Sequence, residues 1–242
     1  MRTQTVYFSP ELHTLCVFPD ERSDLSQAIS ELQLKNSYPV IVLIGDEIDK
    51  LLAAATQQAL ETISGIAQEL GAVVICGATT IGLMAAIGPI RKQNQHTFPL
   101  IGIAPEGLVS MPGGPKSAKF LWWGSDRRQL QPLASHFLLV PGSHFGDESA
   151  WMFDTAIVLS QEHQAVTILI NGGEVARKDV ELSLENDRPV IVLSRTGHLA
   201  DALASQPLRH ELITVVPASN GPQIVKAVHA ALAVHEKKPV TV

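Results

Sequence analysis

The sequence predicts an α/β fold in which a mostly parallel central sheet is covered by helices on both faces. Two observations support this prediction. Short runs of β-branched and other apolar residues recur along the chain, and longer segments with apolar residues at three- and four-residue spacing separate them. Because no internal repeat, low-complexity segment or domain linker interrupts the 242 residues, we expect a single domain over residues 1–242.

Eight apolar runs are the predicted strands. Most are apolar at every position, as is typical of parallel strands that are buried on both faces. The first run, TLCVF at residues 14–18, is expected to be an edge strand. The others are residues 40–44, 72–76, 99–104, 136–141, 165–170, 189–194 and 211–216.

Six segments between these runs have helical periodicity: residues 48–70, 82–87, 148–161, 175–185, 198–204 and 223–234. Residues 1–37 are less clear, although Ser23 or Asp24 can cap a short amphipathic helix. Residues 105–135 have neither the periodicity of a strand nor that of a helix. They concentrate Gly, Pro, Trp122, Trp123 and two arginines. We expect an irregular excursion there. It is either functional or mobile, or it is partly ordered with its tryptophans filling a groove.

Composition and charge exclude several classes of protein. A net charge of -6 argues against a nucleic-acid partner, and no run approaches the roughly 18 apolar residues of a membrane span. Cys16 and Cys76 lie in apolar runs and are expected to be free buried thiols. Because the N-terminus also lacks a signal sequence, we expect a cytoplasmic protein.

No common catalytic or cofactor motif is present. The nine histidines show neither HExxH nor paired Cys/His spacing, so we expect no metal site and no cofactor. The P-loop lysine, the GxGxxG spacing and the GxSxG elbow are also missing, which disfavours triphosphate hydrolysis, a standard dinucleotide fingerprint and acyl transfer.

Glycine-rich turns follow five of the predicted strands and are the candidate ligand site. Parallel strands end at the same edge of a sheet, where free backbone N–H groups of the next helix favour an anion. The turns are IGDE with Gly45, CGATTIGLM at 76–84, VPGSHFGDESAW at 140–151, INGGE at 170–174 and SRTGHLAD at 194–201 with Arg195. We expect Gly77, Gly142 and Gly172 to form a phosphate cradle, because each follows a different strand.

Asp147 and Glu148 permit three interpretations. Two acids at a helix start are ordinary partners of the helix dipole. They also suit the vicinal hydroxyls of a ribose. As general acid or base they would need a buried carboxyl group with a shifted pKa.

Taken together, five sequence blocks resemble the SLOG superfamily of Rossmann-like nucleotide-binding domains, in particular the branch shared by TRPM channels and bacterial proteins. The blocks are VICGATTIGLMAAIG (74–88), LIGIAPEG (100–107), SHFLLVPGSHFGDESAW (135–151), ILINGGEVARKDVEL (168–182) and PVIVLSRTGHLADALA (189–204). The resemblance implies a Rossmann-like three-layer sandwich whose strand-end loops bind nucleotide-derived ligands such as ADP-ribose relatives, mostly to sense them.

The resemblance also implies contact residues, namely Gly77, Thr79, Thr80, Gly82, Met84, Gly142, Ser143, Gly146, Asp147, Glu148, Gly172, Gly173, Glu174, Thr196 and Gly197. Two departures accompany it. The turn Arg195-Thr196-Gly197-His198 replaces a Gly-Ser-Gly-Arg pattern, which implies altered phosphate recognition. PGSHFGDE replaces the PGGxGTxxE of the phosphoribohydrolase branch, which argues against hydrolysis.

The leading hypothesis is therefore a cytosolic sensor domain for a nucleotide or nucleotide-derived ligand, with no catalytic residues. The alternative is an N-glycosidase acting on nucleoside monophosphates through Asp147 or Glu148, and a third interpretation is a purely structural subunit. Leu121, Trp122 and Trp123 predict burial beyond one subunit and hence a homo-oligomer. A signal would pass through self-association or a separate effector protein.

Overall fold

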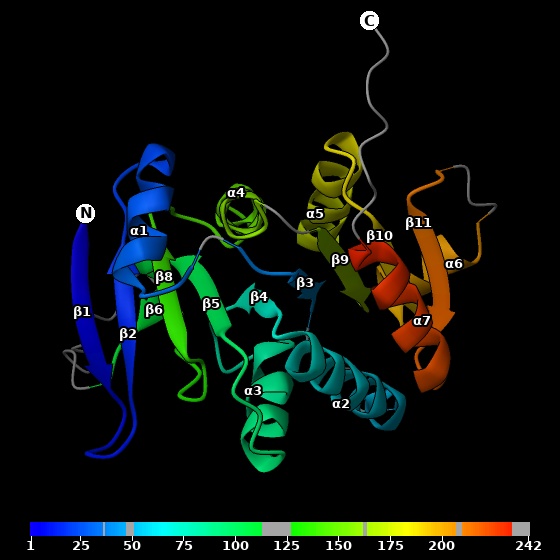
Figure 1. The fold of residues 1–242 in the computed structure, drawn as a ribbon, viewed down its shortest axis with the longest axis horizontal. Coiled ribbons are helices and arrows are strands. Elements are labelled where there is room, and N and C mark those ends of the chain that lie inside the picture. Colours follow the sequence, from blue (N-terminus) through cyan, green and yellow to red (C-terminus); the bar gives the residue numbers. More distant parts are fainter. Residues whose placement is uncertain (36, 47–50, 113–126, 162–163, 207–209, 234–242) are drawn as a thin grey trace, which may run out of the picture.

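The computed structural model describes residues 1–35, 37–46, 51–112, 127–161, 164–206 and 210–233 (Figure 1). Within this part of the chain, one large sheet has the strand order β1-β2-β8-β5-β4-β3-β9-β10-β11. All neighbours are parallel except β1 and β2. The strands are β1 (Arg2–Tyr7), β2 (His13–Phe18), β3 (Val40–Gly45), β4 (Val73–Gly77), β5 (Leu100–Pro105), β8 (His136–Val140), β9 (Ala165–Ile170), β10 (Val190–Ser194) and β11 (Ile213–Pro217).

Helices cover both faces of the sheet and complete a three-layer, Rossmann-like single domain (Figure 1). One face packs against α2 (Ala53–Leu70), α3 (Met84–Gln93) and α7 (Gly221–Leu232). The other packs against α1 (Leu25–Glu31), α4 (Ser149–Leu159), α5 (Glu174–Glu185) and α6 (His198–Ala204). A short 3-10 helix, η1 (Arg22–Asp24), precedes α1.

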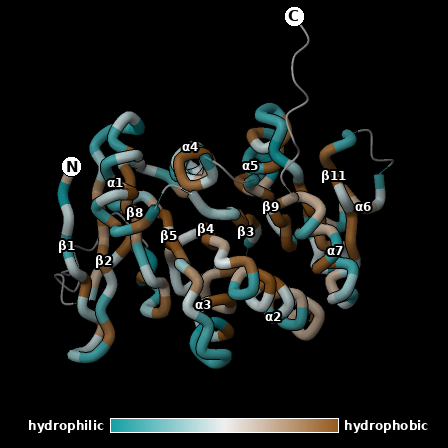
Figure 2. Tube along the Cα trace, viewed as in Figure 1, coloured by the Kyte–Doolittle hydropathy of each residue, from teal (hydrophilic) through white to brown (hydrophobic). Residues whose placement is uncertain are grey.

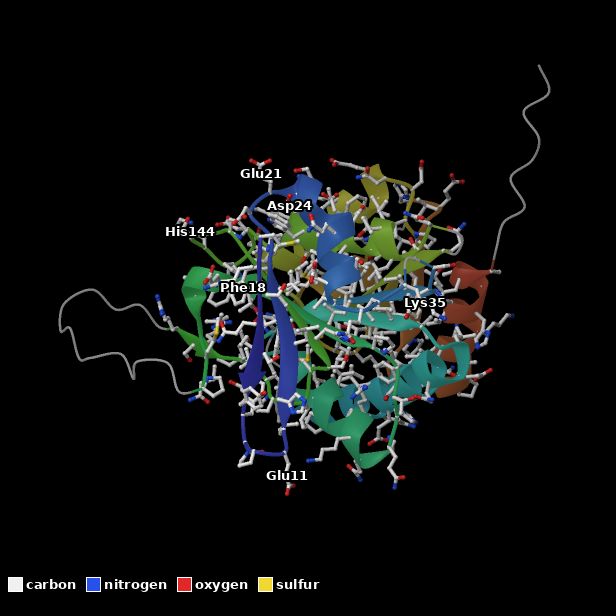
Figure 3. All side chains as sticks on the ribbon, turned by 60° about the vertical axis from the view of Figure 1, so that its left-hand side comes forward. Glu11, Phe18, Glu21, Asp24, Lys35 and His144 are labelled. Atoms are coloured by element: carbon white, nitrogen blue, oxygen red, sulfur yellow. The ribbon has the colours of Figure 1, made fainter. Side chains whose placement is uncertain are left out.

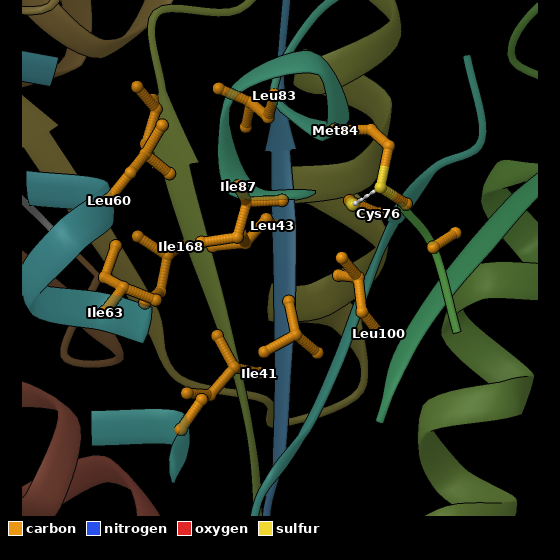
Figure 4. Packing of buried hydrophobic residues seen from close by; sticks show 14 of the residues in the cluster. Ile41, Leu43, Leu60, Ile63, Cys76, Leu83, Met84, Ile87, Leu100 and Ile168 are labelled. Atoms are coloured by element: carbon orange, nitrogen blue, oxygen red, sulfur yellow. Dashed lines mark hydrogen bonds between the residues drawn. The ribbon is translucent and has the colours of Figure 1, made fainter. Parts of the chain in front are cut away.

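Side chains that alternate along each strand contribute to the hydrophobic cores on both faces of the sheet. In β3, Ile41 and Leu43 belong to the core beneath α2 and α3, whereas Val42 and Ile44 belong to the core on the opposite face. Figure 4 shows Ile41 and Leu43 in their cluster with side chains of α2 and α3. Hydrophobic colour accordingly follows the strands in Figure 2, with polar residues on the outer surfaces of the helices. This two-sided burial is the reason that the central strands are apolar at every position.

The N-terminal strands correct one expectation. The run at residues 14–18 was expected at the edge, but β2 lies between β1 and β8, and β1 forms the edge. Five of the six residues of β1 are exposed, so its sequence lacks the apolar run by which the other strands were predicted. Figure 3 shows Glu11 at the turn of this hairpin, and the Arg2 guanidinium lies 3.7 Å from the centre of the Phe18 ring.

The predicted helices are present with shifted ends. Helix α3 runs to Gln93 instead of residue 87, and α2 begins at Ala53, with residues 47–50 outside the described part. Ahead of α1, the Asp24 carboxylate accepts hydrogen bonds from the backbone N–H groups of Asp20 and Glu21. Cys16 and Cys76 are free and buried, as expected.

The excursion predicted at residues 105–135 is partly regular. After Pro105 ends β5, a 3-10 turn η2 (Glu106–Leu108) leads into β6 (Val109–Ser110), which pairs in parallel with β7 (Arg128–Gln129). The excursion is therefore partly ordered, at its two ends. The predicted interface residues Leu121, Trp122 and Trp123 lie outside the described residues.

Candidate functional site

The strand order places a crevice at the carboxyl end of β3. From β3 the chain proceeds outward through β4, β5 and β8, and then returns to β9 on the other side of β3 before continuing to β10 and β11. The connections after β3 and β9 therefore leave in opposite directions. Such a reversal is where open α/β sheets bind ligands, because the loops separate there.

A cleft of about 280 Å³ opens at this position. It is lined by the ends of β3, β4 and β5, the loop between β4 and α3, the starts of α3 and α5, one residue of β7 and two residues of the loop before α4. The lining residues are Leu43, Gly45, Asp46, Gly77, Ala78, Thr79, Ile81, Gly82, Leu83, Met84, Ile103, Ala104, Arg128, Phe145, Glu148, Gly173, Glu174, Val175 and Ala176.

Two helix N-termini face the cleft without a side-chain cap. Helix α3 is preceded by Gly82 and Leu83, and α5 by Gly173, and neither helix has its first backbone N–H groups capped by a side chain. Gly82 has φ +78, a left-handed conformation that glycine adopts without strain. Uncapped N–H groups together with the helix dipole favour an anionic group at these two positions.

The charged residues of the cleft are mostly acidic. Asp46, Glu148 and Glu174 line it together with one described cation, Arg128. A Cβ atom built on Gly173 would lie 3.4 Å from Asp46 Oδ2, so the Asp46 carboxylate lies beside the start of α5. Carboxylates accept hydrogen bonds from hydroxyl groups, so this wall suits a hydroxylated part of a ligand rather than a second phosphate.

Strand β7, which lies in the segment 105–135, forms one wall of the cleft. The backbone N–H of Thr80 donates to the Gln129 carbonyl at 2.9 Å, and Thr79 forms an isolated bridge with Leu130. These bonds hold β7 beside the loop that follows β4. Arg128 projects from β7 with its guanidinium 4.4 Å from the centre of the Phe145 ring.

The loop after β8 satisfies its own N–H groups. The Asp147 carboxylate accepts hydrogen bonds from the backbone N–H of Ser143 at 2.7 Å and of His144 at 3.0 Å. These bonds hold the pKa of Asp147 below its ordinary value. Asp147 therefore occupies the position in which this loop would otherwise accept an anion. Figure 3 shows His144 at the periphery of the molecule.

Glu148 faces the cleft from the same loop. Its Oε2 accepts a hydrogen bond from the Gly146 N–H at 2.6 Å. Burial raises the pKa of the Glu148 carboxyl above its ordinary value, and the charges of Asp179 and Asp147 act in the same direction, against the lowering effect of the backbone hydrogen bonds. Glu148 is therefore a carboxyl group that lines the cleft and has a raised affinity for a proton.

The turn after β10 also has backbone N–H groups that are hydrogen-bonded within the protein. The Asp201 carboxylate accepts hydrogen bonds from the N–H of Arg195 at 2.5 Å and of Gly197 at 3.1 Å. The Thr196 hydroxyl is buried, accepts from the Asn171 N–H at 2.8 Å and donates to the Leu193 carbonyl at 2.6 Å. These bonds stabilise the turn and leave it outside the cleft lining.

The structure therefore divides the predicted contact residues into two groups. Those that line the cleft are Gly45, Gly77, Thr79, Gly82, Met84, Glu148, Gly173 and Glu174. Those outside its lining are Thr80, Gly142, Ser143, Gly146, Asp147, Gly172, Arg195, Thr196 and Gly197. Of the three glycines expected to form a phosphate cradle, only Gly77 lines the cleft, and the space for a Cβ atom on it is open to 4 Å.

Sequence reasoning missed Asp46, Arg128 and Phe145 as lining residues. Asp46 had a usable signal, because it directly follows the glycine that ends β3. Arg128 and Phe145 had none, because only the tertiary contact between β7 and the loop after β8 brings them together.

Two further findings concern the described part of the chain. No group of three His, Cys, Asp or Glu residues there could hold a metal ion. No helix there is long and apolar enough to cross a membrane.

Comparison with solved structures supports the fold. The X-ray structure of TM1055, a Northeast Structural Genomics Consortium target, aligns with a TM-score of 0.56 at 16% identity, covering 79% of this chain and 99% of that chain. A search of curated proteins finds no match. The family model described as "SLOG in TRPM, prokaryote" matches residues 38–236, from just before β3 to beyond α7, and leaves β1, β2 and α1 outside. This chain therefore belongs to the family of prokaryotic SLOG domains related to those of TRPM channels.

Proposed function

We propose that the cleft binds a nucleotide or nucleotide-derived ligand of the ADP-ribose type and that the protein acts as a sensor of it. The observation that supports this function best is the position of the cleft at the strand-order reversal, between two uncapped helix N-termini. Membership in the SLOG family agrees with a nucleotide-related ligand.

The lining residues suggest how such a ligand lies. A phosphate is best placed at the start of α5 or of α3, because neither helix start has a side-chain cap. Ribose hydroxyls are best placed against the carboxylates of Asp46, Glu148 and Glu174. Arg128 supplies the one described positive charge of the lining and can pair with a phosphate that extends toward β7.

Isothermal titration calorimetry with AMP, ADP-ribose, cyclic ADP-ribose and NAD tests the proposal. Gly77→Val is the informative variant, because its side chain would enter the cleft without meeting a protein atom at Cβ. We expect it to lower the affinity at least about tenfold. Gly65→Val is the matched control, because Gly65 is exposed in the middle of α2 and its Cβ position is equally open.

Two results would contradict this function. One is that none of the four ligands binds wild-type protein at millimolar concentration. The other is that Gly77→Val and Gly65→Val bind the ligand equally well while both remain folded.

A second candidate function is hydrolysis of the N-glycosidic bond of a nucleoside monophosphate. The observation that favours it is Glu148, a half-buried carboxyl group that lines the cleft and whose pKa is raised by burial. Release of the base from AMP, followed by chromatography, tests it. Glu148→Gln should abolish turnover and retain binding, and absence of turnover in wild-type protein would exclude this function.

We also propose that the sensor signals through self-association or a separate effector protein. Light scattering at micromolar concentration, with and without ligand, tests self-association. A monomer of 26.1 kDa under both conditions would leave a separate effector as the route.

A further inference from the structure

Two exposed aliphatic side chains lie in the cleft. Ile81 and Val175 line it, and each is 39% exposed. Single exposed aliphatic residues are common on protein surfaces. Ile81 and Val175 are not single, because both lie in one small cleft whose charged residues are mostly acidic. A ligand that buries both side chains gains hydrophobic stabilisation.

The two side chains approach the cleft from opposite layers of the sandwich. Ile81 belongs to the loop between β4 and α3, and Val175 to the first turn of α5. Helices α3 and α5 cover opposite faces of the sheet (Figure 1). A flat group that enters the crevice therefore has an aliphatic side chain available on each side.

Local contacts position both residues. The Thr79 hydroxyl donates to the Ile81 carbonyl at 3.3 Å, and β7 supports the same loop through the bond between Thr80 and Gln129. Val175 packs against the loop after β8, where a Cβ atom on Gly146 would lie 3.3 Å from Val175 Cγ2. Neither side chain belongs to a segment outside the described residues.

A third apolar group completes the arrangement. The Phe145 ring is half-buried, lines the cleft and is adjacent to Gly146 in the chain. The Arg128 guanidinium stacks on this ring, which restricts where the ring can move. Ile81, Val175 and Phe145 together form what we term the apolar clamp.

We infer that the apolar clamp holds a nucleobase, so that the ligand of this cleft contains a purine or pyrimidine ring and is not a sugar phosphate alone. This inference rests on the proposed function. A nucleobase is the part of a nucleotide with two flat faces that carry no charge, whereas ribose exposes hydroxyl groups and phosphate exposes charged oxygens, so the base gains most from aliphatic neighbours. Because the three clamp side chains carry no hydrogen-bonding group, they do not distinguish adenine from guanine.

Calorimetry with AMP and ribose 5-phosphate tests the clamp. We expect wild-type protein to bind AMP at least about tenfold more tightly, because only AMP fills the clamp. The double variant Ile81→Thr/Val175→Thr keeps the branch at Cβ but places a hydroxyl group at each position, and at Ile81 it also removes the terminal methyl group. It should lose about tenfold in affinity for AMP and retain its affinity for ribose 5-phosphate.

The matched control is Ile157→Thr/Val225→Thr. These residues are 51% and 36% exposed, lie in α4 and α7, and do not line the cleft. This control should bind both ligands as wild-type protein does.

The possible failures are distinguishable. If none of AMP, ADP-ribose, cyclic ADP-ribose and NAD binds wild-type protein, the proposed function fails and the clamp fails with it. If both bind equally, or if the clamp variant loses both equally, the clamp alone is refuted and the cleft remains a phosphate and ribose site.

Discussion

Gly77 ends a buried strand and Gly172 follows one, and the sequence assigned both to one phosphate cradle, but the structure predicts different responses to alanine. Gly172 has φ +90, and a Cβ atom on it would lie 2.8 Å from both Ala176 Cβ and Leu169 Cδ1. Leu169 can rotate away, but Ala176 is fixed in the first turn of α5. For Gly77 nothing lies within 4 Å of the same position.

The cost of Gly172→Ala follows from these two contacts. A non-glycine residue held in an unfavourable positive-φ conformation costs about 1–3 kcal/mol. Overpacking against a rigid neighbour costs about 1–3 kcal/mol more. We therefore expect the free energy of unfolding to fall by about 2–6 kcal/mol, and the melting temperature of a protein of this size to fall by about 4–24 °C.

Urea denaturation and thermal unfolding, followed by far-ultraviolet circular dichroism, measure this difference. Gly77→Ala is the control and should change the free energy of unfolding by less than about 1 kcal/mol. If Gly172→Ala is as stable as Gly77→Ala, the conformation described for the loop after β9 is wrong. A variant too unstable to purify would agree with the upper end of the expected range.

Two further predictions concern buried polar groups. Thr155 is fully buried, and its hydroxyl has no hydrogen-bond partner among the described residues, so Thr155→Val should raise the free energy of unfolding by about 1 kcal/mol. Thr14→Val is its control and should lower that free energy, because the Thr14 hydroxyl donates to the Ala134 carbonyl at 3.0 Å. Urea denaturation measures both variants, and equal effects of the two substitutions would contradict this reasoning. Burial raises the pKa of Asp179 from 3.8 to about 6, so the folded protein retains a proton that the unfolded chain releases, and stability falls as the pH rises through this range. As the pH rises from about 4 to 7, the free energy of unfolding of Asp179→Asn should therefore increase relative to that of wild-type protein, by at most about 3 kcal/mol. A difference between the two proteins that does not change with pH would refute the prediction.

Much of the fold was predictable from local sequence pattern. The runs that became β3, β4, β5, β8, β9, β10 and β11 were identified within two residues of their observed ends. Their burial on both faces requires apolar residues at every position, and such runs are visible in a single sequence. β1 was missed because its residues are mostly exposed and it exists through pairing with β2.

The candidate site was predictable in part. Glycine turns at strand ends directed attention to the correct edge of the sheet, and Gly45, Gly77 and Gly173 do line the cleft. Whether a turn is open to a ligand was not visible in the sequence. The carboxylates of Asp147 and Asp201 accept hydrogen bonds from the backbone N–H groups of the turns after β8 and β10. The sequence pattern does not distinguish such an acidic residue from one that contacts a ligand.

The sequence by itself determined the alternation of strands and helices, the parallel character of the sheet and the edge at which its glycine turns gather. Only the tertiary structure decided the strand order, which places the reversal between β3 and β9 and brings Asp46, Arg128 and Phe145 to one cleft. The physical reason is that periodicity and turn chemistry act between residues close in the chain. Strand order and the occupation of a backbone N–H by a carboxylate depend on contacts between distant segments, which a local pattern does not encode.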